Sequence, residues 1–280
     1  MIARYGRSVR AEIRKLTGTR AWWLLSLVLF SYVVLIAVLF AIMFSSIGEL
    51  IGEQGGFALN SLASAQLVYS ASTSFGYAIP LILGGLAVTA EVRHRTLVHT
   101  FAAEPRRGIV LLAKLSVLFV AGVLLGVVGL LASAGVGALT ISLTGGDPML
   151  GAPEVWGLFG RSLLTMGLWG AIGVGLGALV RSQAAVIIIA LAFTQFVEPI
   201  LRMVAGLWDW SAGIGRFLPG AAGDALTGTG LMSDLGSLDP TMEMATVPPL
   251  EPWAGGLVML GYVVVLAGAA WLTRWRADES

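Results

Sequence analysis

The chain has 280 residues, of which 57% are hydrophobic and only 12% are charged, whereas an ordinary soluble domain has about 25% charged residues. Its 17 Lys and Arg and 16 Asp and Glu residues are too few to cover the surface of a soluble protein of this length, so the composition indicates a protein that crosses a membrane several times. The 37 glycines fit this class, because Gly is more frequent in membrane helices than in soluble ones. The absence of cysteine excludes disulfides, thiolate metal sites and Cys nucleophiles.

Six apolar runs are long enough to cross a bilayer, whose core is about 30 Å thick and requires about 20 residues per helix. They lie at residues 22–44, 69–90, 111–143, 158–180, 184–206 and 253–273. The first run is too long for a signal-peptide core, so we expect it to be retained. The predicted fold class is therefore an all-α integral membrane protein with six transmembrane helices, forming a single transmembrane domain over residues 1–280.

The basic residues gather on one side of these runs, and Lys and Arg resist translocation across a membrane. Fourteen of the 17 lie on that side: Arg4, Arg7, Arg10, Arg14, Lys15, Arg20, Arg93, Arg95, Arg106, Arg107, Lys114, Arg181, Arg274 and Arg276. Most of the acidic residues fall on the other side, so the net charge of +1 conceals a strong asymmetry. We therefore expect both termini to be cytoplasmic.

The N-terminal segment, residues 4–20, predicts an amphipathic helix. Val9, Ile13 and Leu16 share one face at spacings of i, i+4 and i+7, and most of the basic residues lie elsewhere. Such a helix lies in the inner membrane interface with its cations against anionic headgroups. A basic flank that only sets topology would look similar, so both interpretations stay open. The expected anchor residues are Arg10, Arg14, Lys15, Trp22 and Trp23.

The inner loop, residues 91–105, predicts a short helix that ends at Pro105. A rigid helix across the inner ends of two spans is suited to docking in a groove of another protein. A loop that only sets topology would explain its charges but not its apolar residues. The candidate docking residues are Glu91, Arg93, His94, Arg95, Thr96, Leu97, Phe101 and Glu104.

The outer segment, residues 207–252, is rich in Pro and Gly, which predicts short helices and turns. Just before it, Glu198 and Arg202 are spaced i, i+4 around Pro199, and an ionisable residue within a span is a functional candidate. The pair is either a hydrated structural pair, or it lines an outer vestibule or braces the outer segment. Whether the segment re-enters the membrane stays open.

Other spacings predict packing and exclude some kinds of chemistry. Gly122/Gly126 and Gly173/Gly177 have the Gly-x-x-x-Gly form that permits close helix contact. The two histidines lack carboxylate neighbours at ligand spacing, so we expect no metal site. No Ser-His-Asp arrangement or paired inward carboxylate occurs, so we expect no catalytic residues.

Three stretches of the chain resemble permease subunits of the type-2 ATP-binding cassette exporter family. The first is Glu12-Ile-Arg-Lys-Leu-Thr-Gly-Thr-Arg20 before a Trp-rich span, which resembles that family's interfacial connecting helix. The second is Glu91-Val-Arg-His-Arg-Thr-Leu97, leading to Glu104-Pro-Arg-Arg107 and Ala113-Lys114, which resembles the coupling helix that sits in a cleft of the ATP-binding subunit. The third is Phe217-Leu-Pro-Gly-Ala-Ala-Gly-Asp-Ala-Leu226, which is similar to a sequence motif common between the fifth and sixth spans of actinobacterial members.

The resemblance implies an exporter in the plasma membrane of a bacterium. It would consist of two permease copies, identical or paralogous, and two cytoplasmic ATP-binding subunits, with membrane lipid and no nucleic acid as further partners. The chain contains no Gly-x-x-x-x-Gly-Lys-Ser/Thr loop, so we expect it to bind no cofactor and not to be an enzyme, with ATP and Mg²⁺ held by the partner subunit.

The apolar spans favour an amphipathic substrate, which would be drug-like, a peptide or lipid-like. Two alternatives stay open. One is a six-span intramembrane enzyme, and the other is an immunity or sensor subunit that docks an ATPase but exports nothing.

Overall fold

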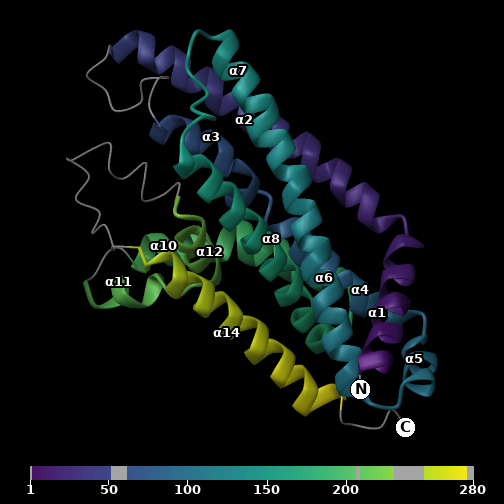
Figure 1. The fold of residues 1–280 in the computed structure, drawn as a ribbon. Helices are drawn as coiled ribbons and strands as arrows, with labels where there is room; N and C mark the ends of the chain where they lie inside the picture. Colours follow the sequence, from purple (N-terminus) through teal and green to yellow (C-terminus); the bar gives the residue numbers. More distant parts are fainter. Residues whose placement is uncertain (1, 52–61, 206–208, 230–248, 276–280) are drawn as a thin grey trace.

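Six helical rods dominate the structure, a computed structural model that describes residues 2–51, 62–205, 209–229 and 249–275 (Figure 1). Every regular element in these ranges is helical, and six rods are long and apolar enough to cross a membrane. The chain is therefore an all-α, multi-pass membrane protein, as its composition predicted.

The first span is formed by the apolar part of α2 (Ala21–Ile51). The second span consists of α3 (Leu62–Ser74) and α4 (Ala78–Arg93), and the third consists of α6 (Arg107–Leu130), the π-helix η1 (Leu131–Val136) and α7 (Gly137–Leu143). The fourth is α8 (Pro153–Val180), and the fifth consists of α9 (Gln183–Ala192), the π-helix η2 (Phe193–Val197) and α10 (Glu198–Ala205). The sixth consists of α14 (Pro252–Ala270) and the π-helix η3 (Trp271–Trp275). The shorter helices are α1 (Ile2–Thr17), α5 (Leu97–Ala103), α11 (Asp209–Gly215) and α12 (Pro219–Thr227).

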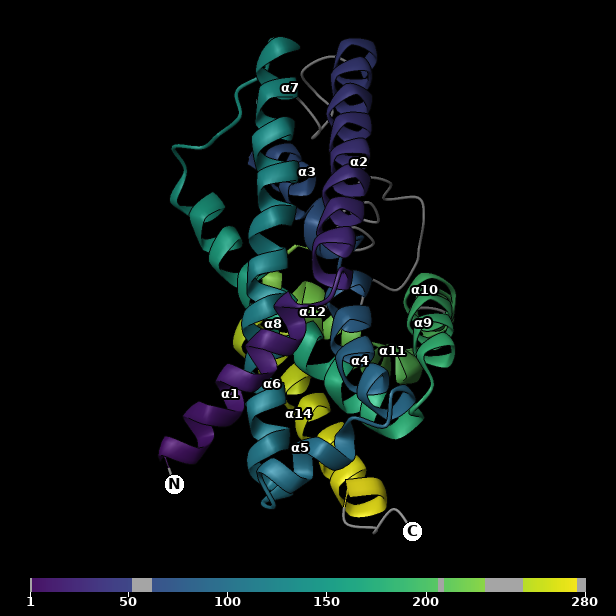
Figure 2. The ribbon, with the colours of Figure 1, turned by 90° about the vertical axis from the view of Figure 1, so that its right-hand side faces the viewer.

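The spans are arranged around α4 and α8, which belong to the two most deeply buried spans. Figure 1 and Figure 2 show α1, α5 and the end of α14 at one end of the molecule, with α7 and the end of α2 at the other. We refer to the end that holds α5 as the α5 end. Because two spans separate α1 from α5, both helices belong at the same membrane side.

Glycine allows α8 to pack closely against both of its main neighbours. A Cβ at Gly173 would overlap the backbone oxygen of Leu81 in α4, and a Cβ at Gly122 in α6 would overlap that of Met166 in α8. The predicted helix contacts at the two Gly-x-x-x-Gly sites are thus confirmed as packing within one chain.

The second span differs most from its predicted range, since it begins at Leu62 and not at residue 69. The added turns, residues 62–68, contain Ser64 and Gln66, which interrupt the apolar run there. Most of these residues are buried against protein. Ser70 and Thr73, further along α3, each donate a hydrogen bond to a carbonyl three residues earlier. A polar helix is stable in a membrane when its polar groups are satisfied internally. The other five spans agree with their predicted ranges to within five residues at each end.

Proline disturbs the helix in both the second and the fifth spans. Pro80 lacks an N–H and its ring crowds the carbonyl four residues earlier, at Gly76, which accounts for the break at residues 75–77. In the fifth span η2 comes directly before Glu198 and Pro199. Pro199 cannot donate to the carbonyl of Thr194, and the hydroxyl of Tyr77 donates to that carbonyl instead, at 3.0 Å. The two irregular segments therefore meet, and the second span supplies a donor for a carbonyl that the fifth span leaves free.

Candidate functional site

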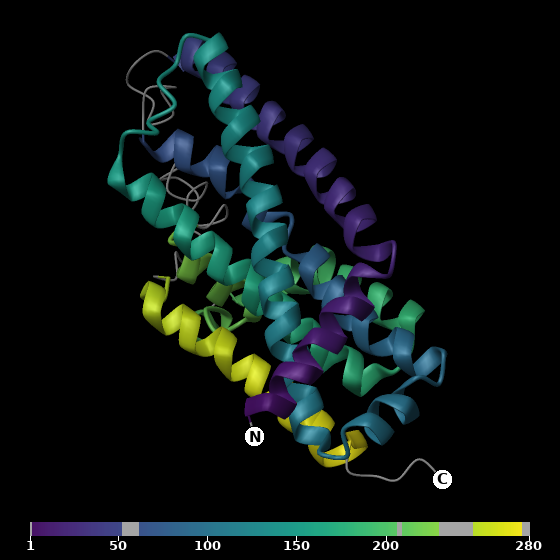
Figure 3. The same ribbon diagram turned by 45° about the vertical axis from the view of Figure 1, so that its right-hand side comes forward.

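The loop between α4 and α6 presents α5 at the α5 end of the molecule (Figure 3). The single helix predicted over residues 91–105 is wrong, because α4 continues to Arg93 and α5 begins only at Leu97. Between them the N–H of Thr96 donates to the carbonyl of Glu91 at 3.0 Å, and Arg95 has a left-handed φ of 53°. This pattern terminates a helix without Gly or Pro, at a cost of about 1–2 kcal/mol for a left-handed residue other than Gly.

The candidate docking residues separate into an exposed and an inward group. The exposed group consists of Arg93, His94, Arg95 and Thr96. The inward group consists of Glu91, Leu97, Phe101 and Glu104. Only the exposed group can contact a partner directly. Arg93 is also engaged within the chain, because its Nη1 donates to Oε1 of Gln183 in α9 at 2.9 Å.

The exposed side of α5 includes residues that the sequence did not single out. Val98 is 57% exposed, and His99 and Ala102 are exposed beside it. We define the α5 surface as His94, Arg95, Thr96, Val98, His99 and Ala102. It combines an apolar centre with imidazole and guanidinium groups, a composition suited to a protein partner.

The inward group fixes α5 to the bundle. Leu97 is buried, and the ring of Phe101 packs under the guanidinium of Arg107, whose Cζ lies 5.0 Å from the ring centroid. Glu104 accepts a hydrogen bond from the backbone N–H of Arg106 at 3.3 Å. These residues hold α5 in place and are not available to a partner.

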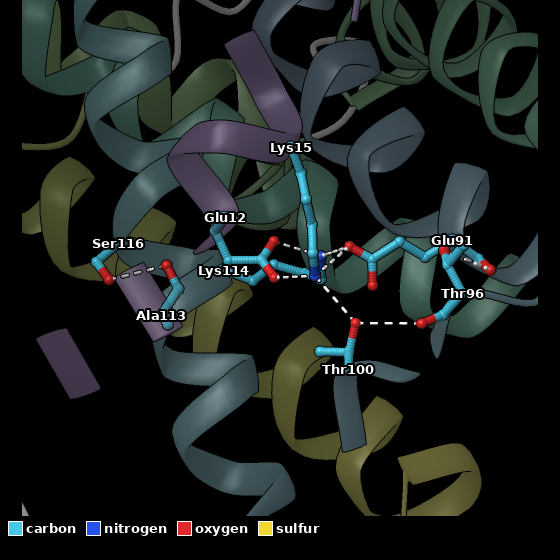
Figure 4. A network of polar contacts seen from close by, with 8 residues as sticks. All are labelled: Glu12, Lys15, Glu91, Thr96, Thr100, Ala113, Lys114 and Ser116. Carbon is cyan, nitrogen blue, oxygen red and sulfur yellow. Dashed lines mark hydrogen bonds and ion pairs between the residues drawn. The ribbon is translucent and has the colours of Figure 1, made fainter. Parts of the chain in front are cut away.

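A cluster of four charged side chains lies directly behind α5 (Figure 4). We call Glu12, Lys15, Glu91 and Lys114 the charge cluster. The ammonium of Lys114 donates to Oε2 of Glu12 at 2.5 Å and to Oε1 of Glu91 at 2.6 Å. That of Lys15 donates to Oε1 of Glu12 at 2.7 Å and to Oε1 of Glu91 at 3.0 Å.

Burial makes this pairing necessary. Lys114 is 0% exposed and Glu12 only 4%, and an isolated charge in such a place would be strongly unfavourable. Two cations and two carboxylates make the cluster formally neutral. Burial by itself lowers the pKa of Lys15, but the carboxylates of Glu12 and Glu91 more than offset it and leave the pKa raised above its usual 10.5. Lys15 is thus cationic at neutral pH.

The charge cluster joins four helices at the α5 end. Glu12 and Lys15 come from α1, Glu91 from the last turn of α4 and Lys114 from α6. Lys15 also donates to Oγ1 of Thr100 in α5 at 3.0 Å. Displacement of α5 would therefore strain contacts to α1, α4 and α6 together.

The N-terminal helix is present as predicted, over Ile2–Thr17, but its apolar face packs on protein. Val9 and Leu16 lie against the core, while Ile13 is 46% exposed. Of the expected anchors, Lys15 turns inward to the charge cluster. The others are exposed: Arg10, Arg14, Trp22 and Trp23.

The predicted pair of Glu198 and Arg202 is formed and braces the outer segment. Arg202 donates from Nη2 to Oε1 of Glu198 at 3.0 Å and from Nη1 to Oδ2 of Asp224 in α12 at 2.6 Å. The same Oε1 accepts the backbone N–H groups of Gly220 and Ala221, at 2.6 and 3.1 Å, in the first turn of α12. Glu198 is fully buried. Its carboxylate therefore balances the positive charge of the guanidinium and the partial positive charge of the α12 N-terminus where water does not reach. Both α11 and α12 are short helices, as predicted for this segment, of which residues 207–208 and 230–248 lie outside the described residues.

Sequence reasoning named Lys15 and Glu91 separately and missed Glu12 and Lys114 as site residues. A signal existed for each. Glu12 is an isolated acid in a basic segment, and Lys114 interrupts an apolar run, where a lysine requires a partner. Asp224 had no comparable signal, because a carboxylate in an outer segment is ordinary.

Among the described residues, no group of three His, Asp or Glu side chains gathers as metal ligands. Comparison with protein-family models gives no match, and a search of curated proteins also finds no similar sequence. The resemblance noted above therefore rests on its motifs alone.

Proposed function

We propose that the chain is the membrane-spanning subunit of an ATP-driven exporter, with the α5 end facing the cytoplasm and a separate ATP-binding subunit docked on the α5 surface. The observation that carries this proposal is the two-sided character of α5. One side is exposed around Val98, and the other is fixed to the bundle through Leu97, Phe101 and the charge cluster. A helix held in this way transmits a push from outside to the spans behind it.

The contacts of α5 and the charge cluster indicate which helices a displacement of α5 would move. Closure of the ATP-binding subunits on ATP and Mg²⁺ would displace α5, and with it the inner ends of α4 and α6 and the helix α1. Two such subunits, related by a second copy of this chain or a paralogue, would then open and close a path between the copies. The chain itself carries no phosphate-binding loop.

The substrate that suits these spans is amphipathic, such as a drug-like molecule, a peptide or a lipid. The charged residues described within the spans lie toward their two ends: Glu91, Arg93, Arg107 and Lys114 at the α5 end, and Glu154, Arg161, Glu198 and Arg202 at the other. The wall between them offers apolar contact and hydroxyl groups, but no fixed charge to select a small ion.

The test uses the full chain, tagged and purified with its partner from bacterial membranes. The double variant Arg95→Glu/Val98→Glu places two negative charges on the α5 surface, and neither wild-type side chain forms a hydrogen bond or an ion pair within the described residues. We expect the rates of co-purifying Mg²⁺-dependent ATP hydrolysis and of ATP-driven efflux each to fall about tenfold or more, because charges buried in an interface are costly. Thermal unfolding should stay as in wild type. Arg216→Glu, a charge reversal at an exposed outer position, should change neither activity.

Three outcomes would overturn the proposal. Unchanged hydrolysis and efflux in the folded double variant would remove α5 as the docking element. Chemical turnover by the purified chain alone would identify an intramembrane enzyme. An ATPase that binds the α5 surface without ATP-driven movement of any substrate would identify an immunity or sensor subunit.

A further inference from the structure

We propose that the exposed arginine face of α1 binds the headgroups of anionic phospholipids, and that this binding stabilises α5 through the charge cluster. The arginine face consists of Arg7, Arg10 and Arg14. The proposal concerns lipid and the chain alone, and it does not depend on an ATP-binding subunit.

The charge on this face is uncompensated. Glu12, the one acidic residue of α1, points away from it and is neutralised by Lys114 and Lys15. Arg7, Arg10 and Arg14 are exposed and have no ion-pair partner in the described part of the chain. At 100° per residue these three arginines fall within about 60° of arc, on the side of α1 opposite Glu12. The helix therefore presents only positive charge to its surroundings.

The position of α1 places this charge at the level of lipid headgroups. The hydroxyls of Tyr5 and Ser116 lie 2.6 Å apart, and Glu12 binds Lys114. The two contacts are about 10 Å apart along α1 but only about 3 Å apart along α6. The helix α1 thus crosses α6 and does not follow it, as an interfacial helix does.

Apolar and aromatic surface begins immediately beside α1. Val120 and Leu124, one and two turns beyond Ser116 in α6, are 53% and 62% exposed. Trp22 and Trp23 are also exposed, at the start of the first span, where indole rings mark the boundary between lipid and water. The arginine face therefore lies next to lipid-facing surface, and phospholipid is the anionic partner nearest to it.

The opposite side of α1 connects lipid binding to α5. Lys15 bonds to Thr100 in α5, and Glu12 bonds to Lys114 behind it. Headgroups that hold α1 in the interface also hold Lys15 against Thr100. The anionic lipid content of the membrane would in this way set how firmly α5 is presented.

The test exploits the absence of cysteine in the chain. The exposed Ala11 is changed to Cys and labelled with an environment-sensitive fluorophore, in the full chain reconstituted into phosphatidylcholine vesicles with increasing phosphatidylglycerol. Hydrogen exchange of the α5 amides is measured on the same samples. Matched variants are Arg7→Gln/Arg10→Gln/Arg14→Gln on α1 and, as a control, Arg106→Gln, which removes an exposed arginine from the same end but not from α1 or the α5 surface.

We expect phosphatidylglycerol to shift the fluorescence and slow the exchange of α5 in wild type and in the control variant. The triple variant should need at least tenfold more phosphatidylglycerol, since each basic residue near a membrane surface contributes about fivefold. Raised salt should weaken the shift, and soluble glycerol phosphate added to phosphatidylcholine vesicles should produce none.

Equal responses of wild type and the triple variant would overturn lipid binding by the arginine face. A fluorescence shift without slower exchange in α5 would overturn the link through the charge cluster. A response to soluble glycerol phosphate would identify a free phosphate site instead of a lipid surface. Normal lipid response in the triple variant, with loss of co-purifying ATP hydrolysis, would assign the face to a protein partner.

Discussion

The most constrained residue at the α5 end is Lys114, whose ammonium lies in the interior between two carboxylates. It is fully buried, and its contacts to Glu12 and Glu91 join residues 102 and 23 positions away. A buried ion pair contributes little net stability relative to well-packed apolar residues, but removal of one partner leaves an uncompensated charge. The charge cluster therefore acts as a specific connection, because α1 can satisfy it in one position only.

We predict that Lys114→Met lowers stability by about 3–5 kcal/mol, because Glu12 and Glu91 would share only the half-exposed Lys15. Thermal unfolding of the purified chain in detergent measures the loss. Adding Glu12→Gln to Lys114→Met should recover part of it, since the unpaired carboxylate is gone. A double variant that loses the full sum of the two single effects would show that the residues do not interact.

Among the elements, α12 is attached to the fifth span through the pair of Glu198 and Arg202. Oε1 of Glu198 accepts two N–H groups of its first turn, and Nη1 of Arg202 donates to its Asp224. Gly220 makes this possible, since a Cβ there would overlap the guanidinium of Arg202 and lie 2.5 Å from Oε1 of Glu198. The outer segment is therefore attached to the fifth span by a contact that a single methyl group disrupts.

We predict that Gly220→Ala destabilises the attachment of α12 by about 1–3 kcal/mol, the cost of a buried hydrogen bond left unmade. Hydrogen exchange should become faster in α12 before it changes in α4 or α8. Gly213→Ala in the neighbouring α11, where a Cβ meets no atom within 4 Å, provides the matched control. Equal protection of α12 in both variants would contradict the bracing role of Glu198.

At the scale of the whole molecule, the two spans between α1 and α5 place both helices on one side, and the positive-inside rule predicts that this side is cytoplasmic. The exposed basic residues at the α5 end include Arg10, Arg14 and Arg95. The loop between α7 and α8 instead contains Asp147 and no Lys or Arg. The structure gathers these basic residues at one end, and the positive-inside rule predicts that this end faces the cytoplasm.

Cysteine labelling tests this orientation, again because the chain has no cysteine of its own. We expect Ala102→Cys on α5 to react with a membrane-impermeant maleimide only in inverted vesicles. Gly151→Cys, between α7 and α8, should react in intact cells. Both positions are exposed, so access to the reagent decides the result, and the reverse pattern would invert the orientation and the proposed docking side with it.

The sequence predicted features that depend on solvent and on neighbouring residues. The six spans follow from apolar length, and the pair of Glu198 and Arg202 follows from helix geometry. The start of the second span was missed because Ser64 and Gln66 interrupt its apolar run, and such polar residues are tolerated where a helix is buried against protein. The division between α4 and α5 was missed because Arg95 adopts a left-handed conformation that Gly usually supplies.

The sequence alone determined the class of the protein, its spans and the asymmetry of its charge, because these follow from the cost of placing each residue in lipid. Only the tertiary structure decided which charges meet. Glu12 and Lys114 belong to helices that cross at one level, and the low dielectric between them makes their pairing obligatory. The tertiary structure also decided which side of α5 is exposed, because a helix of seven residues is too short for the pattern of its apolar residues to indicate the face that packs.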